Sequence, residues 1–501
     1  MHDNLQQQII KKIHELINTC TVLILFLFFI LYVGIFSHLT VNRFLSFGAH
    51  YYDLGIMDQT VYNTSQGYFL DMTNPHLLKN TSRLAIHFDP ILAIFAPFYS
   101  LYADPKVLLI AQTVLLGAGG LALYVIAQHT TGSKLISLFI SLLYFLYYPM
   151  QNSNLFDFHA VTIATTSLFF MYLFLKIKPF QKQWMNMFLG IIFLTISLLC
   201  KEHISLTTLF FGLYLWVTEK KKSIPLFIIT LSMTTFIIVV FKVIPYFKEG
   251  LPNAIEYYDF RNPFALFKRL FDWESYNYIY NLLLPVGFIS LLSPLHLLIA
   301  TPDILINLLS SNGNMRGFYF HYTATITPFV FIAATYGIKK LYSLLEKKLY
   351  KRELIAILLL ILLTAIYTNW KKGALVRADY TIDVKRLDMV RYWQRRLKDD
   401  RITVSATGKI APFFTARRYF IDFLYDPSYM STGKTKEDLY EEIGKYERAD
   451  YVLIYTKEID TSSTISMTYY NHLKTNPNYQ MVDDREGIEV YERRDIINLN
   501  E

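Results

Sequence analysis

The sequence predicts a mainly α-helical, polytopic membrane bundle that carries a small C-terminal α/β domain. The 501 residues are 53% hydrophobic and 16% aromatic, with a mean hydropathy of +0.29, which is too apolar for a soluble chain of this length. About eleven apolar segments are long enough to cross, or nearly cross, a bilayer. From Lys371 onward the composition becomes that of a soluble domain.

The apolar segments divide the chain into two predicted domains. Residues 1–370 form the transmembrane domain, with a large first loop over residues 40–103, and residues 371–501 form the α/β domain. A shorter apolar piece, Pro90 to Tyr102, is interrupted by Pro97, and we expect it to lie at the membrane interface. The expected spans lie at residues 16–38, 107–128, 133–150, 160–177, 184–200, 203–218, 223–245, 277–293, 294–310, 322–338 and 353–370.

The C-terminal residues alternate between short strand-like and helix-like patterns. Residues 402–406 and 450–455 are rich in Val, Ile and Tyr and predict strands, and residues 479–494 predict two strands around a Gly-containing turn. Residues 437–446 predict a helix. This mixture indicates a small α/β domain.

The basic residues predict the orientation in the membrane. If Pro90 to Tyr102 does not cross, the basic runs at 176–182, 219–222 and 339–352 fall on the same side as Lys11 and Lys12. We therefore expect a multi-pass protein of the cell membrane. The positive-inside rule places its N-terminus in the cytoplasm and its C-terminal domain on the extracytoplasmic side. The polar clusters in the loops gather on the outer face.

Composition and motifs exclude several classes of function. Cys20 and Cys200 both lie in apolar segments, so we expect neither a disulfide framework nor a cysteine metal site. The net charge of +8 comes largely from basic runs beside apolar segments, which is typical of membrane orientation and not of nucleic-acid binding. No P-loop, dinucleotide-binding glycine pattern or Gly-x-Ser-x-Gly turn is present, which argues against ATP-driven transport and serine-hydrolase chemistry.

The first outer loop carries Asp53, Asp58, His87 and Asp89 beside a point of membrane entry. Carboxylates and a histidine in this position are suited to binding a divalent cation or to accepting a proton from a sugar hydroxyl. The alternative is that these acids are solvated or cap the helices of the loop.

Two further outer segments carry polar residues. Asp157 and His159 lie in a very short turn between two spans, where Asp157 is equally typical of a helix N-cap. Arg316 and His321 lie in a later loop, where Arg316 is either a phosphate contact or an ordinary loop arginine.

Lys201, Glu202 and His203 interrupt an otherwise nearly continuous apolar sequence at the outer end of a span. Three ionisable residues are costly at this depth unless they face a cavity or one another. Lys201 could hold a phosphate, and Glu202 could pair with it or act as a base. The alternative is an internal Lys–Glu pair that fixes helix packing.

Four separated motifs resemble, in order and spacing, those of an uncharacterised family of bacterial and archaeal predicted multi-pass membrane proteins. They are residues 52–59, 87–90, 155–159 and 200–203, and the resemblance covers roughly residues 45–420. That family is similar to the glycosyltransferase C superfamily, which includes oligosaccharyltransferases, protein mannosyltransferases and the aminoarabinose transferase of lipid A.

The resemblance implies a helix bundle of the glycosyltransferase C type, a large first outer loop with an essential acid, and a polyprenyl-phosphate sugar donor reached from the membrane. It often implies a divalent metal, Mg²⁺ or Mn²⁺. Asp53 matches the position of the essential acid best, and Asp58 and Asp89 would be its partners as metal ligands. The first loop has Asp-x-x-x-x-Asp, whereas many members have Asp-x-Asp or Glu-x-Asp.

We therefore expect a membrane glycosyltransferase that moves a sugar from a polyprenyl-phosphate donor to an unknown acceptor at the outer face. Asp53 would be the general base or a metal ligand, and Lys201 would contact the lipid phosphate. The remaining expected substrate-binding residues are Asp58, His87, Asp89, Asp157, His159, Glu202, His203, Arg316 and His321. The main alternative is a transporter or flippase for a lipid-linked or small anionic substrate, although the repeated halves typical of many transporters are not visible. A third is an inactive scaffold that binds partners.

Overall fold

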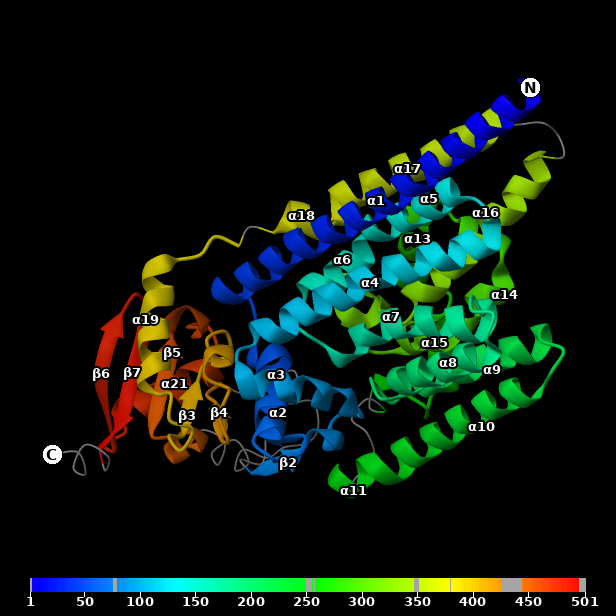
Figure 1. Ribbon diagram of the computed structural model, residues 1–501. Helices are drawn as coiled ribbons and strands as arrows, with labels where there is room; N and C mark the ends of the chain where they lie inside the picture. Colours follow the sequence, from blue (N-terminus) through cyan, green and yellow to red (C-terminus); the bar gives the residue numbers. More distant parts are fainter. Residues whose placement is uncertain are drawn as a thin grey trace.

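The computed structural model describes residues 2–74, 79–248, 255, 257–346, 351–378, 380–424 and 444–494. Long helices run side by side in a bundle, and the α/β domain lies at one end of it, at the left of Figure 1. The first loop, with α2 (Ile56–Ser65) and α3 (Ala96–Leu101), lies between the bundle and this domain. The bundle helices are α1 (His2–Leu45), α4 (Lys106–Thr131), α5 (Lys134–Phe145), α6 (Tyr148–Leu155), α7 (Ala160–Tyr172), α8 (Gln183–Leu198), α9 (Ile204–Thr218), α10 (Ser223–Ile238), α11 (Ile244–Lys248), α12 (Pro263–Arg269), α13 (Trp273–Leu283), α14 (Pro294–Leu297), α15 (Thr301–Leu309), α16 (Thr327–Glu346), α17 (Lys351–Lys372) and α18 (Ala374–Arg377).

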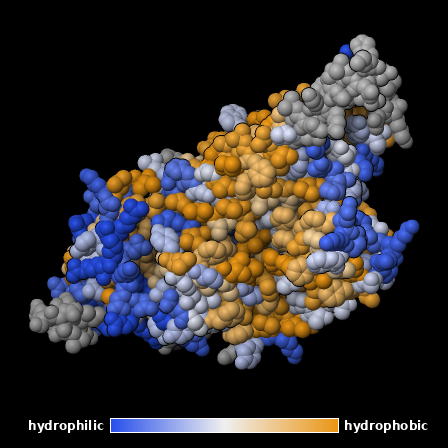
Figure 2. Space-filling view, in the orientation of Figure 1, coloured by the Kyte–Doolittle hydropathy of each residue, from blue (hydrophilic) through white to orange (hydrophobic). Residues whose placement is uncertain are grey.

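Five helical segments among the described residues are long and apolar enough to cross a membrane. They are Thr19–Leu45, Lys106–Thr131, Ala160–Ile177, Ser223–Lys248 and Arg352–Lys372. Shorter apolar helices are found at Pro90–Leu101, Lys134–Phe145, Gln183–Leu198, Ile204–Thr218 and Pro294–Leu309. Figure 2 shows apolar residues gathered over the middle of the bundle and hydrophilic residues at its two ends, as expected for a membrane-embedded belt. The number of spans and the domain boundary at residue 370 stay predictions.

Several predicted apolar segments, among them 133–150, 277–293 and 294–310, are not single continuous α-helices. Within 277–293, α13 ends at Leu283 because Pro285 cannot continue a helix, and Gly287 and Phe288 adopt left-handed backbone with φ of 59° and 56°. A Cβ on Gly287 would also lie 2.7 Å from Ile361, so α17 approaches this turn closely. The segment from Pro90 forms a 3₁₀ helix, η3 (Pro90–Phe95), followed by α3, and its position at the membrane interface stays a prediction.

The C-terminal domain is built on a five-stranded sheet with the order β4-β3-β5-β7-β6. β3 is parallel to β4 and β5, whereas β7 is antiparallel to β5 and β6. Two helices, α19 (Val384–Arg396) and α21 (Thr464–Thr475), accompany the sheet. The predicted helix at 437–446 lies largely outside the described residues. The strands are β3 (Val404–Ala406), β4 (Phe420–Asp422), β5 (Tyr451–Tyr455), β6 (Tyr479–Arg485) and β7 (Ile488–Arg493), and they lie where the sequence predicts strands, except β4.

The C-terminal domain holds the first loop in place. The backbone N–H of Tyr51 donates to the carbonyl oxygen of Gly408 over 2.9 Å, and Arg418 forms an ion pair with Asp71. Asp71 belongs to a two-stranded hairpin, β1 (Asp71–Thr73) and β2 (Asn80–Ser82), in the first loop. These contacts fix the segment that carries Asp53.

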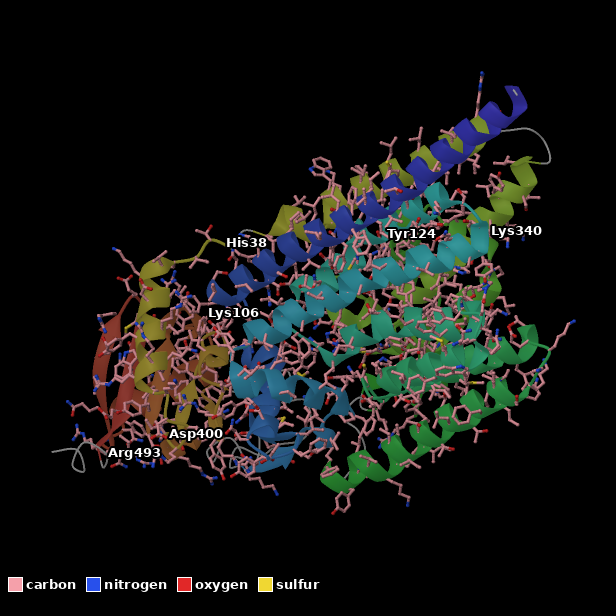
Figure 3. The ribbon with its side chains drawn as sticks, in the orientation of Figure 1. His38, Lys106, Tyr124, Lys340, Asp400 and Arg493 are labelled. Atoms are coloured by element: carbon pink, nitrogen blue, oxygen red, sulfur yellow. The ribbon has the colours of Figure 1, made fainter. Side chains whose placement is uncertain are left out.

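The predicted basic block and the C-terminal domain lie at opposite ends of the molecule. Lys340 lies at one end of the bundle, and Asp400 and Arg493 lie at the other (Figure 3). This arrangement is compatible with the predicted orientation, which itself stays a prediction.

Candidate functional site

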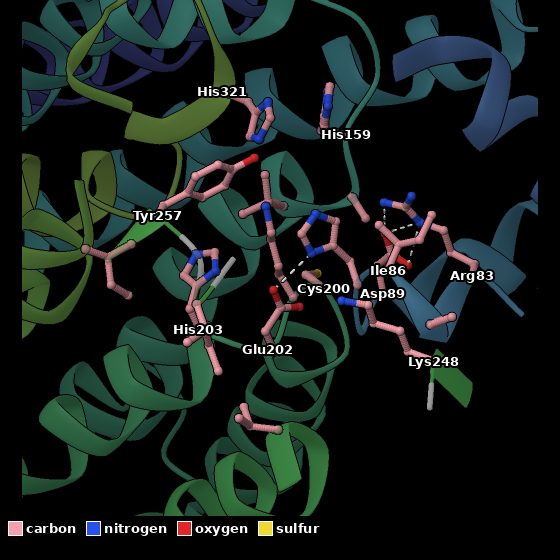
Figure 4. A pocket seen from close by; sticks show the side chains of 18 of the residues that line it. Arg83, Ile86, Asp89, His159, Cys200, Glu202, His203, Lys248, Tyr257 and His321 are labelled. Carbon is pink, nitrogen blue, oxygen red and sulfur yellow. Dashed lines mark hydrogen bonds and ion pairs between the residues drawn. The ribbon is translucent and has the colours of Figure 1, made fainter. Parts of the chain in front are cut away.

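A cavity of about 990 Å³ lies where the first loop meets the α8–α9 turn and the loops around residues 257 and 321. Figure 4 shows His321 and His159 at one end of this cavity, Glu202 and His203 in the middle, and Arg83 with Asp89 on the far side. A cavity of this size is large enough for a sugar phosphate and part of an acceptor. The predicted site residues that line it are Asp53, His87, Asp89, His159, Lys201, Glu202, His203 and His321.

Asp53 is paired with His159. Asp53 lies on a π-helical turn, η1 (Tyr51–Gly55), and its Oδ1 is 3.2 Å from Nε2 of His159, which is the N-cap residue of α7. Nδ1 of His159 lies 2.9 Å from the backbone carbonyl oxygen of Asp157, which can only accept a hydrogen bond. Both ring nitrogens of His159 therefore face oxygen atoms, which hold the ring between the first loop and the turn before α7.

The surroundings keep Asp53 ionised. Burial alone would raise its pKa, but the hydrogen bond and charge of His159 outweigh burial and lower the pKa from its usual value. His50 and Arg43 act in the same direction through their charges. A carboxylate that stays ionised beside a cavity can accept a proton or bind a cationic centre.

His321 stacks on His159, with ring centroids 3.8 Å apart. Only 6% of His321 is exposed, and neither of its ring nitrogens has a hydrogen-bond partner among the residues that the structure describes. Burial, and then the charge of His159, lower the pKa of His321 well below its usual value, so the ring is neutral. Because a buried, unpartnered imidazole is costly, its place in the wall of the cavity favours a polar ligand there.

Lys201 is a cavity-lining cation whose ammonium group makes no hydrogen bond or ion pair with another described residue. Burial, and then the charge of Arg83, lower the pKa of Lys201, while the carboxylates of Glu202 and Asp89 oppose this change. An anionic ligand in the cavity would complete the contacts of this ammonium group.

The carboxylate of the neighbouring Glu202 already has partners in the first loop. Its Oε1 lies 3.0 Å from Nδ1 of His87, and its Oε2 accepts from the backbone N–H of Phe88 over 3.0 Å. Burial alone would raise the Glu202 pKa, but His87 and Lys201 outweigh burial and lower it. Glu202 therefore links the α8–α9 turn to the first loop as a carboxylate, and it does not neutralise Lys201 by direct contact.

Two further pairs complete the polar wall. Arg83 donates from Nε and Nη2 to Asp89, in a buried fork with distances of 2.9–3.2 Å. Nε2 of His203 lies 3.4 Å from Oδ1 of Asp303 on α15.

One wall of the cavity is apolar. It is formed by Phe236, Val240, Phe241 and Phe247, which all lie on the candidate span Ser223–Lys248. Phe241 and Phe247 are also partly exposed. The cavity is therefore lined both by polar groups and by a helix that is a candidate membrane span.

Three predicted substrate contacts do not line this cavity. Asp58 is fully buried and accepts from the hydroxyls of Tyr99 and Thr415, each over 2.7 Å. Asp157 forms a buried ion pair with Arg43 and accepts from the backbone N–H of His50. Because these carboxylates already have partners, the structure gives them roles in holding the first loop.

Arg316 is the third. It forms ion pairs with Asp272 and Glu274 at 2.7 and 2.6 Å and does not line the cavity. The structure therefore supports the alternative interpretation of Arg316 as an ordinary loop arginine.

The donor set does not fit the predicted divalent metal. Within the described residues, no group of three or more His, Cys, Asp and Glu side chains could hold a metal ion. Asp58 faces Tyr99 and Thr415 rather than Asp53, and the carboxylate of Asp89 is occupied by Arg83. Asp53 and Asp58 are five positions apart on a helical segment, a spacing at which side chains do not share a face.

Three residues in or beside the site were not predicted from the sequence. Arg83 and Asp303 line the cavity, and Arg43 holds Asp157. Asp303 was detectable as a lone acid inside a predicted apolar span, which is a signal for function or for a buried partner. Nothing in the sequence around Arg43 marks it as a partner of a residue 114 positions away.

Comparisons with known proteins agree with this architecture. The model of a family described as "Predicted membrane protein (DUF2079)" matches residues 43–490, and the chain belongs to this family. No curated protein sequence matches the chain. The expectation of an uncharacterised membrane-protein family is thereby confirmed.

Two solved structures share the fold. ArnT from Cupriavidus metallidurans in the apo state is 11% identical, with 88% of this chain and 93% of that chain covered and a TM-score of 0.50. The arabinofuranosyltransferase AftD from Mycobacteria is also 11% identical with a TM-score of 0.50, and the match covers 92% of this chain but only 40% of AftD. The fold is that of the glycosyltransferase C membrane enzymes, as expected.

Proposed function

We propose that this member of the DUF2079 family transfers a sugar from a polyprenyl-phosphate donor to an acceptor at the outer membrane face. The observation that carries the proposal is one cavity that joins the Asp53–His159 pair, an apolar wall from a candidate membrane span, and Lys201, a cation without an ion-pair partner in the described part of the chain. A lipid-linked sugar phosphate has the same three parts: a hydroxyl-rich head, an anionic phosphate and an apolar tail.

Lys201 binds the phosphate of the donor. Its ammonium group lines the cavity and has no ion-pair partner among the described residues. A charge-assisted contact would hold the phosphate and stabilise it as it leaves with both electrons of the bond to the sugar. The apolar wall at Phe236, Val240 and Phe241 receives the first part of the lipid tail.

Asp53 acts as the general base. Its carboxylate takes the proton from the acceptor hydroxyl while the acceptor oxygen forms the new bond to the anomeric carbon of the sugar. The bond from that carbon to the phosphate oxygen breaks, and the lipid phosphate is released. His159 holds the carboxylate in position and keeps it ionised before the proton arrives.

His321 lies beside this pair, and its unpartnered nitrogens are suited to a hydroxyl of the sugar or of the acceptor. The alternative function, a flippase for a lipid-linked anion, would use the same cavity but needs no ionised base.

The proposal is tested by measuring sugar transfer directly. The purified chain in lipid vesicles would be supplied with a labelled polyprenyl-phosphate sugar and a panel of candidate acceptors. Appearance of label in an acceptor, together with free lipid phosphate, supports the proposal. Movement of unchanged donor between leaflets without transfer would contradict it and favour the flippase.

A further inference from the structure

The helix α12 has an apolar face that points away from the protein. Arg269 at its end donates from Nη1 to the carbonyl oxygen of Ser310, and Leu270 packs against the core. Phe264 and Phe267, in contrast, are 76% and 58% exposed. In a soluble surface helix the apolar side faces inward, so this arrangement is reversed.

The exposed aromatic residues continue on both sides of α12. Phe260 lies in the turn before α12, and Phe271 lies in the turn after it. The ring of Phe271 is 5.1 Å from that of Phe267, and Trp273 and Tyr276 follow on α13 with their rings 5.3 Å apart. All six side chains are exposed by more than half. We call these six residues the aromatic stripe.

Exposure of the aromatic stripe to water is energetically unfavourable. Six large aromatic side chains in a continuous row exceed the scattered apolar residues that a soluble surface normally carries. The surface must therefore be covered, either by lipid or by another protein.

The composition favours lipid. Phenylalanine, tryptophan and tyrosine gather where the hydrocarbon of a bilayer meets its headgroups, and the exposed Arg261 and Lys268 beside the stripe are suited to lipid phosphates. The position agrees, because Phe260 lines the same cavity as Phe247 and Lys248, which end the candidate span Ser223–Lys248. One residue of the stripe thus lines the same cavity as the end of a helix that is itself expected to face lipid.

We propose that the aromatic stripe lies in the headgroup–acyl boundary of the leaflet next to the cavity, as a half-inserted anchor. Residues 260–276 then do not cross the membrane, and the row of aromatic rings lies parallel to its surface. Phe260 belongs both to the stripe and to the cavity wall, so the anchor sets the mouth of the cavity at the level of the lipid headgroups. This last consequence rests on the proposed function, whereas the insertion itself does not.

The insertion can be measured without any enzymatic assay. Cys20→Ser and Cys200→Ala provide a cysteine-free background, into which Phe264→Cys or Phe267→Cys is introduced and labelled with a small fluorophore in phosphatidylcholine vesicles. Two quenchers are compared: bromine attached to the upper part of the acyl chains, and iodide in the water. Ile237→Cys on the candidate span and Thr461→Cys in the C-terminal domain serve as the lipid-facing and water-facing controls.

Fluorophores at positions 264 and 267 should lose about half or more of their emission to brominated lipid, like the label at position 237, and little to iodide, because an interfacial helix buries its apolar face by about 5–10 Å. Behaviour like that of position 461 would overturn the proposal. Protection from both quenchers would overturn it too, since it would indicate a contact with a second copy of the chain. Failure of the transferase assay would leave these results unaffected, so the two proposals fail separately.

Discussion

His159 connects the first loop to the turn that precedes α7: its Nε2 lies 3.2 Å from Oδ1 of Asp53, while its Nδ1 lies 2.9 Å from the carbonyl oxygen of Asp157. The carboxylate of Asp157 is in turn held by Arg43 and by the backbone N–H of His50. The position of Asp53 is thus fixed by α1, by the α6–α7 turn and by the C-terminal domain, which binds the backbone of Tyr51. Such an arrangement is what a preorganised base requires.

Asp53→Asn should abolish most of the transfer activity. The substitution keeps size and much of the hydrogen bonding but removes the negative charge that accepts the proton, so the rate should fall by about two orders of magnitude or more. Expression and thermal stability should change little. Asp104→Asn is the matched control, because Asp104 directly follows the first loop and does not line the cavity. Near-normal transfer by Asp53→Asn would remove this residue from the mechanism.

His159→Gln should shift the pH dependence of transfer. His159 lowers the pKa of Asp53, so its replacement by a neutral side chain should raise that pKa. Asp53 must be ionised to act as a base, and the acidic limb of the pH–rate profile should therefore move to higher pH. A lower rate with an unmoved acidic limb would show that His159 has a purely structural role.

Lys201→Met should weaken use of the lipid-phosphate donor. Methionine preserves much of the apolar stem but deletes the charge-assisted contact, which is worth about 1.5–3 kcal/mol, so the KM for the donor should rise by about tenfold to a hundredfold. The KM for the acceptor should stay within about twofold. Lys220→Met, at an exposed lysine away from the cavity, is the control. An unchanged donor KM would indicate that Lys201 serves helix packing instead.

Asp58 should make the stability of the protein pH-dependent. Burial raises its pKa to about 7 in the folded state, although the hydroxyls of Thr415 and Tyr99 act against this. Between the pKa of Asp58 in the unfolded state and its higher pKa in the folded state, the folded protein binds more protons than the unfolded one. The stabilisation that protonated Asp58 contributes is therefore complete at low pH and is lost as the pH rises through about 7.

Relative to Asp58→Asn, the free energy of unfolding of the wild type should therefore fall by about 1 kcal/mol per pH unit between about pH 5 and 7. Thermal unfolding in detergent over this range measures the difference. Asp388→Asn, at an exposed carboxylate on α19, should leave the wild-type pH dependence intact. A parallel pH dependence of the wild type and Asp58→Asn would refute the assignment.

The sequence predicted the fold class and most of the cavity for one physical reason. Ionisable residues such as Lys201 and Glu202 at the ends of apolar spans have to face a cavity or a partner, so their presence alone indicates a site. The pairings were not predictable, because Arg43–Asp157 and His203–Asp303 join residues that are far apart in the chain and meet only through tertiary packing.

The sequence also did not predict the direction in which each side chain of the first loop points. Asp53 and Asp58 lie in one conspicuous motif, yet only Asp53 reaches the cavity, and Asp58 turns toward Thr415 of the C-terminal domain. No periodicity in the first loop marks that interface, because it depends on how the two domains dock.

The orientation in the membrane can be tested with two cysteines placed at opposite ends of the molecule. After Cys20→Ser and Cys200→Ala, Ser462→Cys in the C-terminal domain should react with a membrane-impermeant thiol reagent in intact cells, whereas Ser343→Cys in α16 should not. Both positions are exposed, and Ser343 lies beside the basic run at 339–352 that the positive-inside rule assigns to the cytoplasm. Permeabilised cells supply the control, since both cysteines should then react. Labelling of Ser343→Cys in intact cells, alone or together with Ser462→Cys, would contradict the predicted topology. The cavity would then no longer open at the outer face, and a donor presented there could not reach Asp53.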